Sequence, residues 1–183
     1  ACFVEIIETT ARFQNVLVVC DSVQRVQSYF KNTQNIFFTE IESNDTWARD
    51  HGGITVLENG EAQIHDYIFN GWGNKFDAQL DNQITKKLFE IGIFKNCGLK
   101  SSDFVLEGGS IESDGKGTIL TTSACLLSKN RNEHLSKQQI EQVLKNDFGC
   151  HRVLWLENGY LAGDDTDSHI DTLARFCDEN TIA

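Results

Sequence analysis

The order of helical and strand patterns along the chain limits its fold more than any other feature. A helical pattern leads into a short apolar strand pattern three times, before Val16–Val19, before Phe104–Leu106 and before Val153–Leu156. Hairpin patterns lie between these units. Alternating helices and strands predict an α/β protein, but the hairpins depart from the strict order of a doubly wound sheet. We therefore expect repeated mixed modules that pack around an axis.

Local signals set the boundaries of the individual elements. The dipeptide Asn-Gly at 59–60 is a strong hairpin signal and predicts a hairpin over 54–69. Ser136 and Gln139 form a capping box for a helix that ends before Gly149. The patterns also predict an N-terminal helix that reaches Phe13, a helix that begins at Asp81 and ends at Gly92, a hairpin over 104–122, and a strand over 169–176.

The bulk properties exclude several classes of protein. With 16 basic and 27 acidic residues, the net charge of −11 argues against a nucleic-acid surface. No apolar stretch approaches the ~18 residues that a membrane span needs. The N-terminus carries Glu5 and Glu8 where a signal peptide has basic residues. A length of 183 residues suits one domain or a piece of a larger one.

The six cysteines lie far apart and form no C-x-x-C pair. A structural zinc site needs close pairs of ligands, and disulfide frameworks are typical of short secreted chains. We therefore expect no structural zinc, reduced thiols and a cytoplasmic location.

Two short segments hold more chemistry than local structure requires. The segment 43–53 reads SNDTWARDHGG, and a turn there needs neither Trp47 nor the pair Arg49-Asp50. Glu107 ends an apolar strand, and the two glycines after it let another chain or a ligand approach the backbone closely. A carboxylate at a strand end is more often simply solvated.

A third cluster is acidic and contains a histidine. If the segment is extended, Asp165, Asp167, His169 and Asp171 share one face, because side chains alternate along a strand. Three carboxylates and an imidazole suit a metal, a cation or a proton-transfer site. An acidic loop beside a hairpin explains the pattern equally well.

A fourth segment, FNGWGNK at 69–75, reads as a glycine-rich loop anchored by Trp72. The order WARDHG, FNGWGNK, LEGGSIESDGKGTILTT and DDTDSHIDTLARF resembles the agmatine deiminases and the bacterial-type peptidylarginine deiminases. The resemblance runs from about Val16 to the end of the chain. It implies the five-bladed α/β-propeller of the guanidino-modifying enzymes, with repeated ββαβ modules as its blades. Residues 1–183 would then form a single domain, an incomplete part of a larger catalytic propeller domain.

The resemblance also implies an activity and a set of site residues. Enzymes of this family hydrolyse a guanidinium to a ureido group and ammonia, here most plainly agmatine to N-carbamoylputrescine. By similarity, Asp50 and Asp171 clamp the guanidinium nitrogens, and His169 protonates leaving ammonia and then activates water. Glu107 contacts the substrate or holds His169. Trp47, Trp72 and Asp165 complete the substrate-binding set.

The resemblance implies no cofactor and no metal. The partner expected is a small cationic guanidino substrate, with neither nucleic acid nor membrane, and assembly into a homo-oligomer is left open. The family's nucleophilic cysteine lies in a G-G-G-x-I-H-C motif that these 183 residues lack. We assign the nucleophile to none of the six cysteines and expect the isolated chain to be inactive, with both ends of the family sequence missing.

Three other functions compete with this interpretation. The substrate could be free or peptidyl arginine, or the chain could be a non-catalytic module that captures guanidines and polyamines. A metal-dependent hydrolase could use His169 with Asp165, Asp167 and Asp171.

Two residues depart from the family pattern. Gly53 stands where proline is usual, and we expect the turn after Asp50 to be looser as a result. Ser168 stands where glycine is usual, and it strains the backbone beside His169 if that position needs a positive φ.

Overall fold

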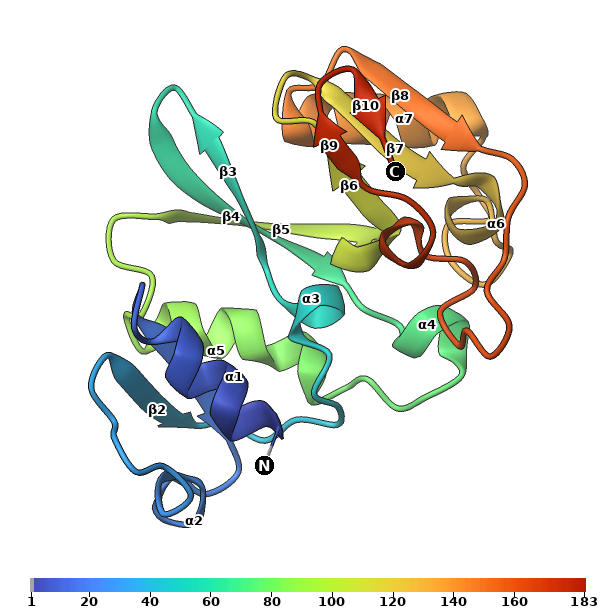
Figure 1. Cartoon of the computed structure of the whole chain (residues 1–183). Coiled ribbons are helices and arrows are strands. Elements are labelled where there is room, and N and C mark those ends of the chain that lie inside the picture. The colour runs from blue at the N-terminus through green and yellow to red at the C-terminus, as the bar shows by residue number, and fades with distance from the viewer. Residues whose placement is uncertain (1) are drawn as a thin grey trace. The chain divides into compact units, whose positions relative to one another are not determined.

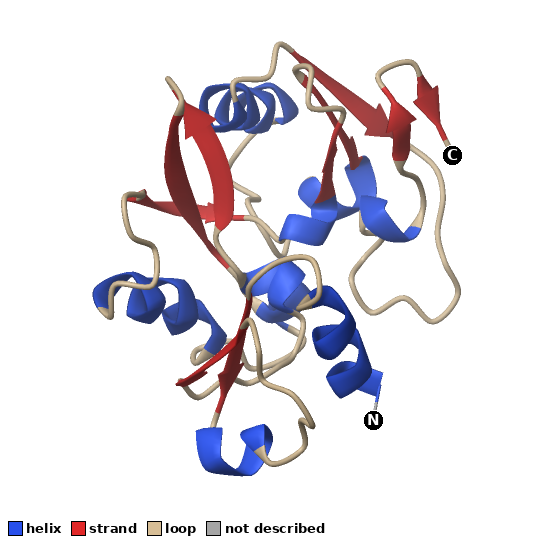
Figure 2. Cartoon of the chain, turned by 60° about the vertical axis from the view of Figure 1, so that its left-hand side comes forward, coloured by secondary structure: helices blue, strands red, loops and turns tan. Residues whose placement is uncertain are grey.

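The computed structural model describes residues 2–183, and the chain divides into two compact units. Unit 1 ends at Asn44, and unit 2 comprises Asp45–Ala183. Figure 1 labels most of the helices and strands, and Figure 2 distinguishes them by colour.

Unit 1 is a small α/β unit with one pair of parallel strands. Its helix α1 ends at Thr10, short of Phe13, whose side chain is 86% exposed. The side chain of Ser22 caps the second helix by accepting a hydrogen bond from the Arg25 amide. The elements are α1 (Cys2–Thr10), β1 (Val16–Cys20), α2 (Val23–Gln27) and β2 (Ile36–Glu40).

Unit 2 contains two three-stranded sheets of the same topology. In each, an antiparallel hairpin is followed by a helix and then by a strand parallel to the second hairpin strand. This order confirms the expected ββαβ modules and the α/β class. The first module comprises β3 (Ile54–Glu58), β4 (Glu61–Ile68), α5 (Ile84–Glu90) and β5 (Gly98–Val105); the second comprises β6 (Ile111–Ser113), β7 (Thr118–Thr122), α7 (Lys137–Phe148) and β8 (Arg152–Leu156).

Short elements lie before, within, between and after the modules and carry most of the polar clusters. They are the helices α3 (Ala48–His51), α4 (Gly71–Asn74) and α6 (Ser123–Leu126), the 3-10 turns η1 (Asp81–Gln83), η2 (Gly108–Ser110) and η3 (Ile170–Thr172), and the strands β9 (Phe176–Asp178) and β10 (Thr181–Ile182), which pair antiparallel.

One apolar core connects the two modules of unit 2. Ile140 and Leu144 of α7 are fully buried in it. Burial of such a side chain stabilises the fold by about 1.5–3 kcal/mol. The core therefore holds the strands of the first sheet against those of the second. Its other buried members are Tyr67, Phe104, Leu106, Ile111, Ile119, Cys125, Leu126 and Cys150.

Two local predictions are confirmed by backbone geometry. Asn59 and Gly60 have φ values of 53° and 85°, as the tight turn between β3 and β4 requires. The Ser136 side chain accepts from the Gln139 amide, and the Gln139 side chain accepts from Ser136. Gly149 ends α7 with a φ of 64°.

Two strand predictions are wrong. Residues 104 and 105 belong to β5 and pair with β4, so the second hairpin begins only at Ile111. The reason is η2, which turns the chain at Gly108–Ser110 between the two strands. The segment predicted as a strand over 169–176 begins as the turn η3, and β9 starts at Phe176.

Among the described residues, no helix is long and apolar enough to cross a membrane.

The capping box gives a first prediction. Replacement of Ser136 by Ala leaves the Gln139 amide in the first turn of α7 without its side-chain acceptor, so we expect the free energy of unfolding to fall by about 0.5–2 kcal/mol. Urea unfolding measures this change. Ser101→Ala, at an exposed position of strand β5, serves as the control, and an equal effect of both substitutions would contradict the capping role.

Candidate active site

The Asp50 carboxylate lies at the centre of the polar cluster. It is buried on α3, a short helix that lies beside η2 (Figure 1). The Trp72 indole Nε1 donates to Asp50 Oδ2 at 3.0 Å, and the Gly109 amide donates to Oδ1 at 2.9 Å. The two hydrogen bonds fix the orientation of the carboxylate and leave lone pairs on both oxygens for a further donor.

Trp72 is the buried anchor that its glycine-rich segment predicted. Its ring packs edge-on against Phe69 and Phe76, with centroid separations of 4.9 and 5.6 Å. Its backbone has a φ of 55°, which is uncommon for a bulky residue. The buried ring and its hydrogen bond to Asp50 offset the energetic cost of this unusual backbone conformation.

Glycine is required at position 109 because three candidate side chains converge there. A β-carbon at Gly109 would lie 2.6 Å from Asp50 Oδ1, 2.6 Å from His169 Nδ1 and 2.8 Å from Asp171 Oδ2. At Gly108 it would lie 2.2 Å from the Arg49 carbonyl oxygen. The close approach expected from the glycine pair is therefore confirmed.

His169 and Asp171 reach the cluster from the turn η3. The His169 residue is 1% exposed, with Nδ1 3.6 Å from Asp50 Oδ1 and Nε2 without a hydrogen-bond partner among the described residues. Burial raises the pKa of the Asp171 carboxyl above its usual value. The His169 ring opposes this increase, and the charge of Asp50 adds to it.

Glu107 is fully buried and paired with a residue that the sequence analysis missed. The Arg131 Nε–H is shared between the two Glu107 oxygens, at 3.1 and 3.0 Å. Neither side chain of the pair is exposed. Arg131 lies in a polar loop before α7, where no periodicity or motif marks a lone arginine as buried.

The acidic segment is not extended, so the shared face that an extended segment would give does not form, and the alternative of an acidic loop is the one observed. The Asp164 carboxylate accepts hydrogen bonds from the Thr166 and Ser168 amides, so the chain turns back on itself over these residues. Asp167 and Ser168 have φ values of 63° and 66°, which no strand allows. The side chains therefore separate.

Each acidic side chain of the loop has its own surroundings. Asp165 is exposed, and only its carbonyl oxygen accepts from Lys75, at 2.8 Å. Asp167 pairs with Lys75 and lies 3.5 Å from Arg131 Nη1. The structure thus brings His169 and Asp171 to the cluster and leaves Asp165 outside it.

The same cluster contains one group of residues that could ligate a metal ion. Among the described residues, Glu107, Cys125 and His169 form the one group whose ligating atoms all lie within 4.8 Å of one another. The Arg131 guanidinium already occupies both Glu107 oxygens, so a metal ion would meet a buried positive charge. Burial also raises the pKa of the Cys125 thiol well above its usual value. The group suits the existing ion pair better than a metal.

The other residues of α3 and its flank have different environments. Trp47 is 62% exposed at the start of the helix. An Arg49 Nη2–H donates to the Ile111 carbonyl oxygen at 3.3 Å, which holds α3 against β6. His51 is buried against Phe69, with ring centroids 5.9 Å apart.

The two departures from the family pattern have structural consequences. Ser168 has a φ of 66°, so the expected backbone strain beside His169 is confirmed. The Gly53 amide donates to Thr85 Oγ1 at 2.9 Å, a hydrogen bond that proline cannot make.

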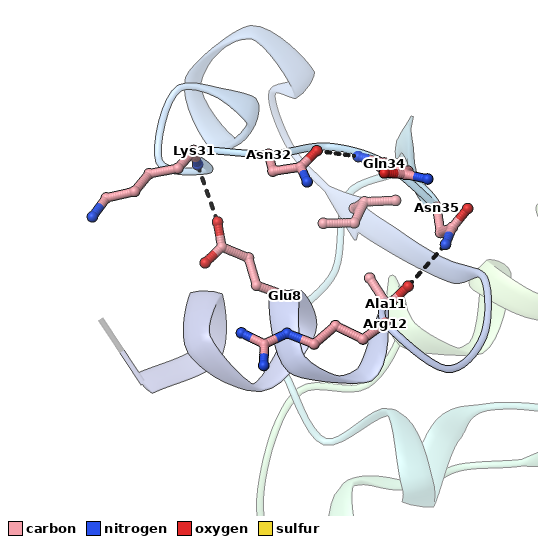
Figure 3. Close-up of a pocket in the computed structure, with 8 residues that line it drawn as sticks. Glu8, Ala11, Arg12, Lys31, Asn32, Gln34 and Asn35 are labelled. Carbon is pink, nitrogen blue, oxygen red and sulfur yellow. Dashed lines mark hydrogen bonds between the residues drawn. The ribbon is translucent and has the colours of Figure 1, made fainter.

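Unit 1 contains a pocket of its own. In unit 1 a polar pocket lies beside α1, where Glu8 accepts from the Lys31 amide at 3.0 Å and Asn35 Nδ2 donates to the Ala11 carbonyl at 2.9 Å (Figure 3). Arg12 and Lys31 are exposed and only Glu8 is part-buried, so the pocket has no buried charged group of the kind that marks a specific site.

Comparisons with known proteins agree with the sequence motifs. A family model described as Porphyromonas-type peptidyl-arginine deiminase matches residues 1–183. An agmatine deiminase of Pseudomonas aeruginosa is 39% identical over 184 residues, which are 97% of this chain and 48% of the relative. The chain spans about half the length of the curated relatives it matches.

Solved structures show the same fold. A cysteine-to-serine variant of C. jejuni agmatine deiminase with substrate bound is 47% identical, with a TM-score of 0.92 over 98% of this chain and 53% of that one. The agmatine deiminase of Enterococcus faecalis is 33% identical, with a TM-score of 0.87 over 98% and 50%.

The convergence on Gly109 gives a second prediction. Gly109→Ala forces a methyl group against Asp50 and His169, so we expect a loss of about 1–3 kcal/mol in the free energy of unfolding. Gly115→Ala is the matched control, because its φ of 67° is unfavourable but no atom lies within 4 Å of the new methyl group. A cost at Gly109 no larger than at Gly115 in urea unfolding would contradict the close packing.

Proposed function

The chain belongs to the Porphyromonas-type peptidyl-arginine deiminase family, and on that premise we propose that it supplies the guanidinium-binding and proton-transfer groups of a guanidino-group hydrolase. The observation that carries the proposal is the convergence of Asp50, His169 and Asp171 around Gly109. Two carboxylates and an imidazole at one point suit a planar organic cation.

Asp50 and Asp171 bind the guanidinium in this proposal. A guanidinium stays charged at any physiological pH and presents N–H donors in one plane, which carboxylate oxygens accept. The hydrogen bonds from Trp72 and Gly109 hold Asp50 in position before substrate arrives. Trp47 and Asp165 are exposed in this chain, and we propose that they contact the substrate farther from its guanidinium.

His169 transfers the protons. A cysteine thiolate adds to the guanidinium carbon, and His169 donates a proton to an amino group on that carbon, which leaves as ammonia. Water then attacks the amidino-thioether carbon while His169 removes its proton, and the thiolate departs to leave a ureido group. The buried, unpartnered Nε2 of His169 supports this role. Glu107, buried beside the ring, supports the charged imidazolium.

The nucleophile lies outside this chain in our proposal. Burial raises the pKa of the Cys20, Cys125 and Cys150 thiols, which disfavours the reactive thiolate. None of the six cysteines stands in a G-G-G-x-I-H-C motif. Cys125, the cysteine nearest to Glu107 and His169, is a fully buried core residue.

We propose agmatine as the substrate, with N-carbamoylputrescine and ammonia as the products. We propose that the reaction serves the formation of putrescine. The names of the similar proteins and the acidic cluster, which favours a dication over a carboxylate-bearing arginine, support this choice. We also propose that both units belong to one domain of a five-bladed propeller, since the family model spans them and the ββαβ module repeats. The six free thiols are consistent with a cytoplasmic location.

The third prediction tests the activity. We expect the full-length protein to release ammonia from agmatine faster than from arginine or an arginine peptide, and His169→Gln to lower the rate about 10²–10⁴-fold. We expect the 183-residue chain to bind agmatine in calorimetry without releasing ammonia.

Each contrary result has a distinct meaning. Turnover by the isolated chain would contradict the claim that its nucleophile lies elsewhere. Binding without release by the full-length protein would replace the enzyme with a non-catalytic module.

The fourth prediction concerns pH. Because burial raises the pKa of Asp171, its carboxyl is neutral at acidic pH and gains its charge only as the pH rises through that pKa. Agmatine affinity should therefore increase with pH over this range, and binding should release a proton. Calorimetry in buffers of different ionisation enthalpy measures both effects.

Asp171→Asn is the matched variant, because it keeps the shape of the side chain and cannot ionise. It should bind agmatine more weakly with a flatter pH dependence. Equal pH dependence in the two proteins would assign the titration to another group.

A further inference from the structure

Arg131 is a buried cation in a loop, and its surroundings connect most of the candidate site. It lies between α6 and α7, outside any helix or strand, and its side chain is not exposed. A guanidinium away from water is costly unless anions and acceptors surround it. The partners of Arg131 therefore define what the residue does.

One end of the Arg131 side chain contacts Glu107. The Nε–H is shared between both carboxylate oxygens, so the positive charge of Arg131 lies directly against the negative charge of Glu107. His169 and Cys125 also face Glu107, with ligating atoms within 4.8 Å. Arg131 is thus the cation that compensates Glu107 beside the His169 ring.

The other end of the guanidinium contacts the loop that leads to His169. Nη2 donates to the Thr166 carbonyl oxygen at 3.0 Å. Nη1 lies 3.5 Å from Asp167 Oδ2, and Asp167 in turn pairs with Lys75. The guanidinium therefore joins the strand end that carries Glu107 to the loop that carries His169.

The residues on either side of Arg131 fix its backbone. The Asn132 side chain accepts from the Val105 amide and donates to the Val105 carbonyl oxygen, at 3.0 and 2.9 Å. The Asn130 carbonyl oxygen accepts from Asn70 Nδ2 at 2.7 Å. The backbone beside Arg131 is therefore held at the end of β5. Through its side chain, Arg131 attaches the loop at 164–169 to this fixed position.

Stability alone does not explain this arrangement. A buried ion pair is often no more stabilising than apolar side chains of the same volume, because desolvation offsets the attraction. Arg131 instead sets the positions of the Glu107 carboxylate and of the loop that carries His169, both beside the proposed reacting centre. Small displacements of such groups cost large factors in rate.

We propose that Arg131 is a positioning residue, which holds the Glu107 carboxylate in place and fastens the loop that presents His169. The assignment of a catalytic consequence rests on the proposed guanidinium hydrolysis. The attachment of the loop is a property of this chain and is measurable without turnover.

The fifth prediction uses three variants. Arg131→Lys keeps the charge but cannot reach Glu107 and Thr166 together, Arg131→Met removes the charge, and Arg152→Met is a control at an arginine that donates to Thr118 in the second module. We measure hydrogen exchange of the Ser168 and His169 amides in the 183-residue chain. We measure kcat and KM for agmatine in the full-length protein.

We expect both Arg131 variants to speed exchange of the two amides by about tenfold or more, because the hydrogen bonds to Asp164 and Thr166 that protect them open when the loop is released. In the full-length protein Arg131→Met should lower kcat about 100-fold with KM nearly unchanged, and Arg131→Lys should recover part of the loss. The Arg152 variant should match the wild type.

Each outcome supports or overturns one claim. Unchanged exchange in Arg131→Lys overturns the attachment of the loop, and unchanged kcat in an active full-length Arg131→Lys overturns the catalytic consequence. If Arg131→Met does not fold, Arg131→Lys carries the test, because its charge still compensates Glu107. An inactive wild-type protein with faster exchange in the variants would remove the proposed function and leave the attachment of the loop standing.

Discussion

The two hydrogen bonds that fix Asp50 are the constraint on which the rest of the site depends. Their donors, the Trp72 indole and the Gly109 amide, come from different segments, so the bonds join α3, the α4 turn and η2. A buried carboxylate is costly unless donors surround it, and these donors meet that need with specific geometry. With Asp50 fixed, His169 and Asp171 approach the same glycine from the segment that forms η3.

The charges in the cluster divide into two kinds. Glu107 is compensated inside the protein by Arg131, and the two form a neutral pair that is shielded from water. Asp50 has neutral donors, and the raised pKa of Asp171 reflects burial beside another carboxylate. An organic cation that arrives between these two carboxylates relieves their repulsion, which links the geometry of the site to the class of ligand we propose.

Patterns that act within a few residues were predictable from the sequence. The turn at Asn59-Gly60 and the cap at Ser136 follow from local chemistry, and the residues that meet at Gly109 were identified through family motifs. The shape of the loop at 164–171 was not predictable by strand periodicity, because Asp164 hydrogen bonds and two positive φ values override it. Arg131 was missed because its importance lies in contacts with residues 24 and 35 positions away, which no local pattern encodes.

The central claim is that a guanidinium binds at Asp50, and the three indole N–H groups of the chain offer a direct measurement. The Trp72 N–H donates to Asp50, whereas the Trp155 N–H donates to Glu141 in the second module and serves as an internal reference. Titration with agmatine, followed by proton–nitrogen NMR, should shift the Trp72 indole resonance to saturation and leave that of Trp155 in place. Asp50→Asn should weaken the response. Binding of agmatine that leaves the Trp72 resonance unmoved would contradict the account.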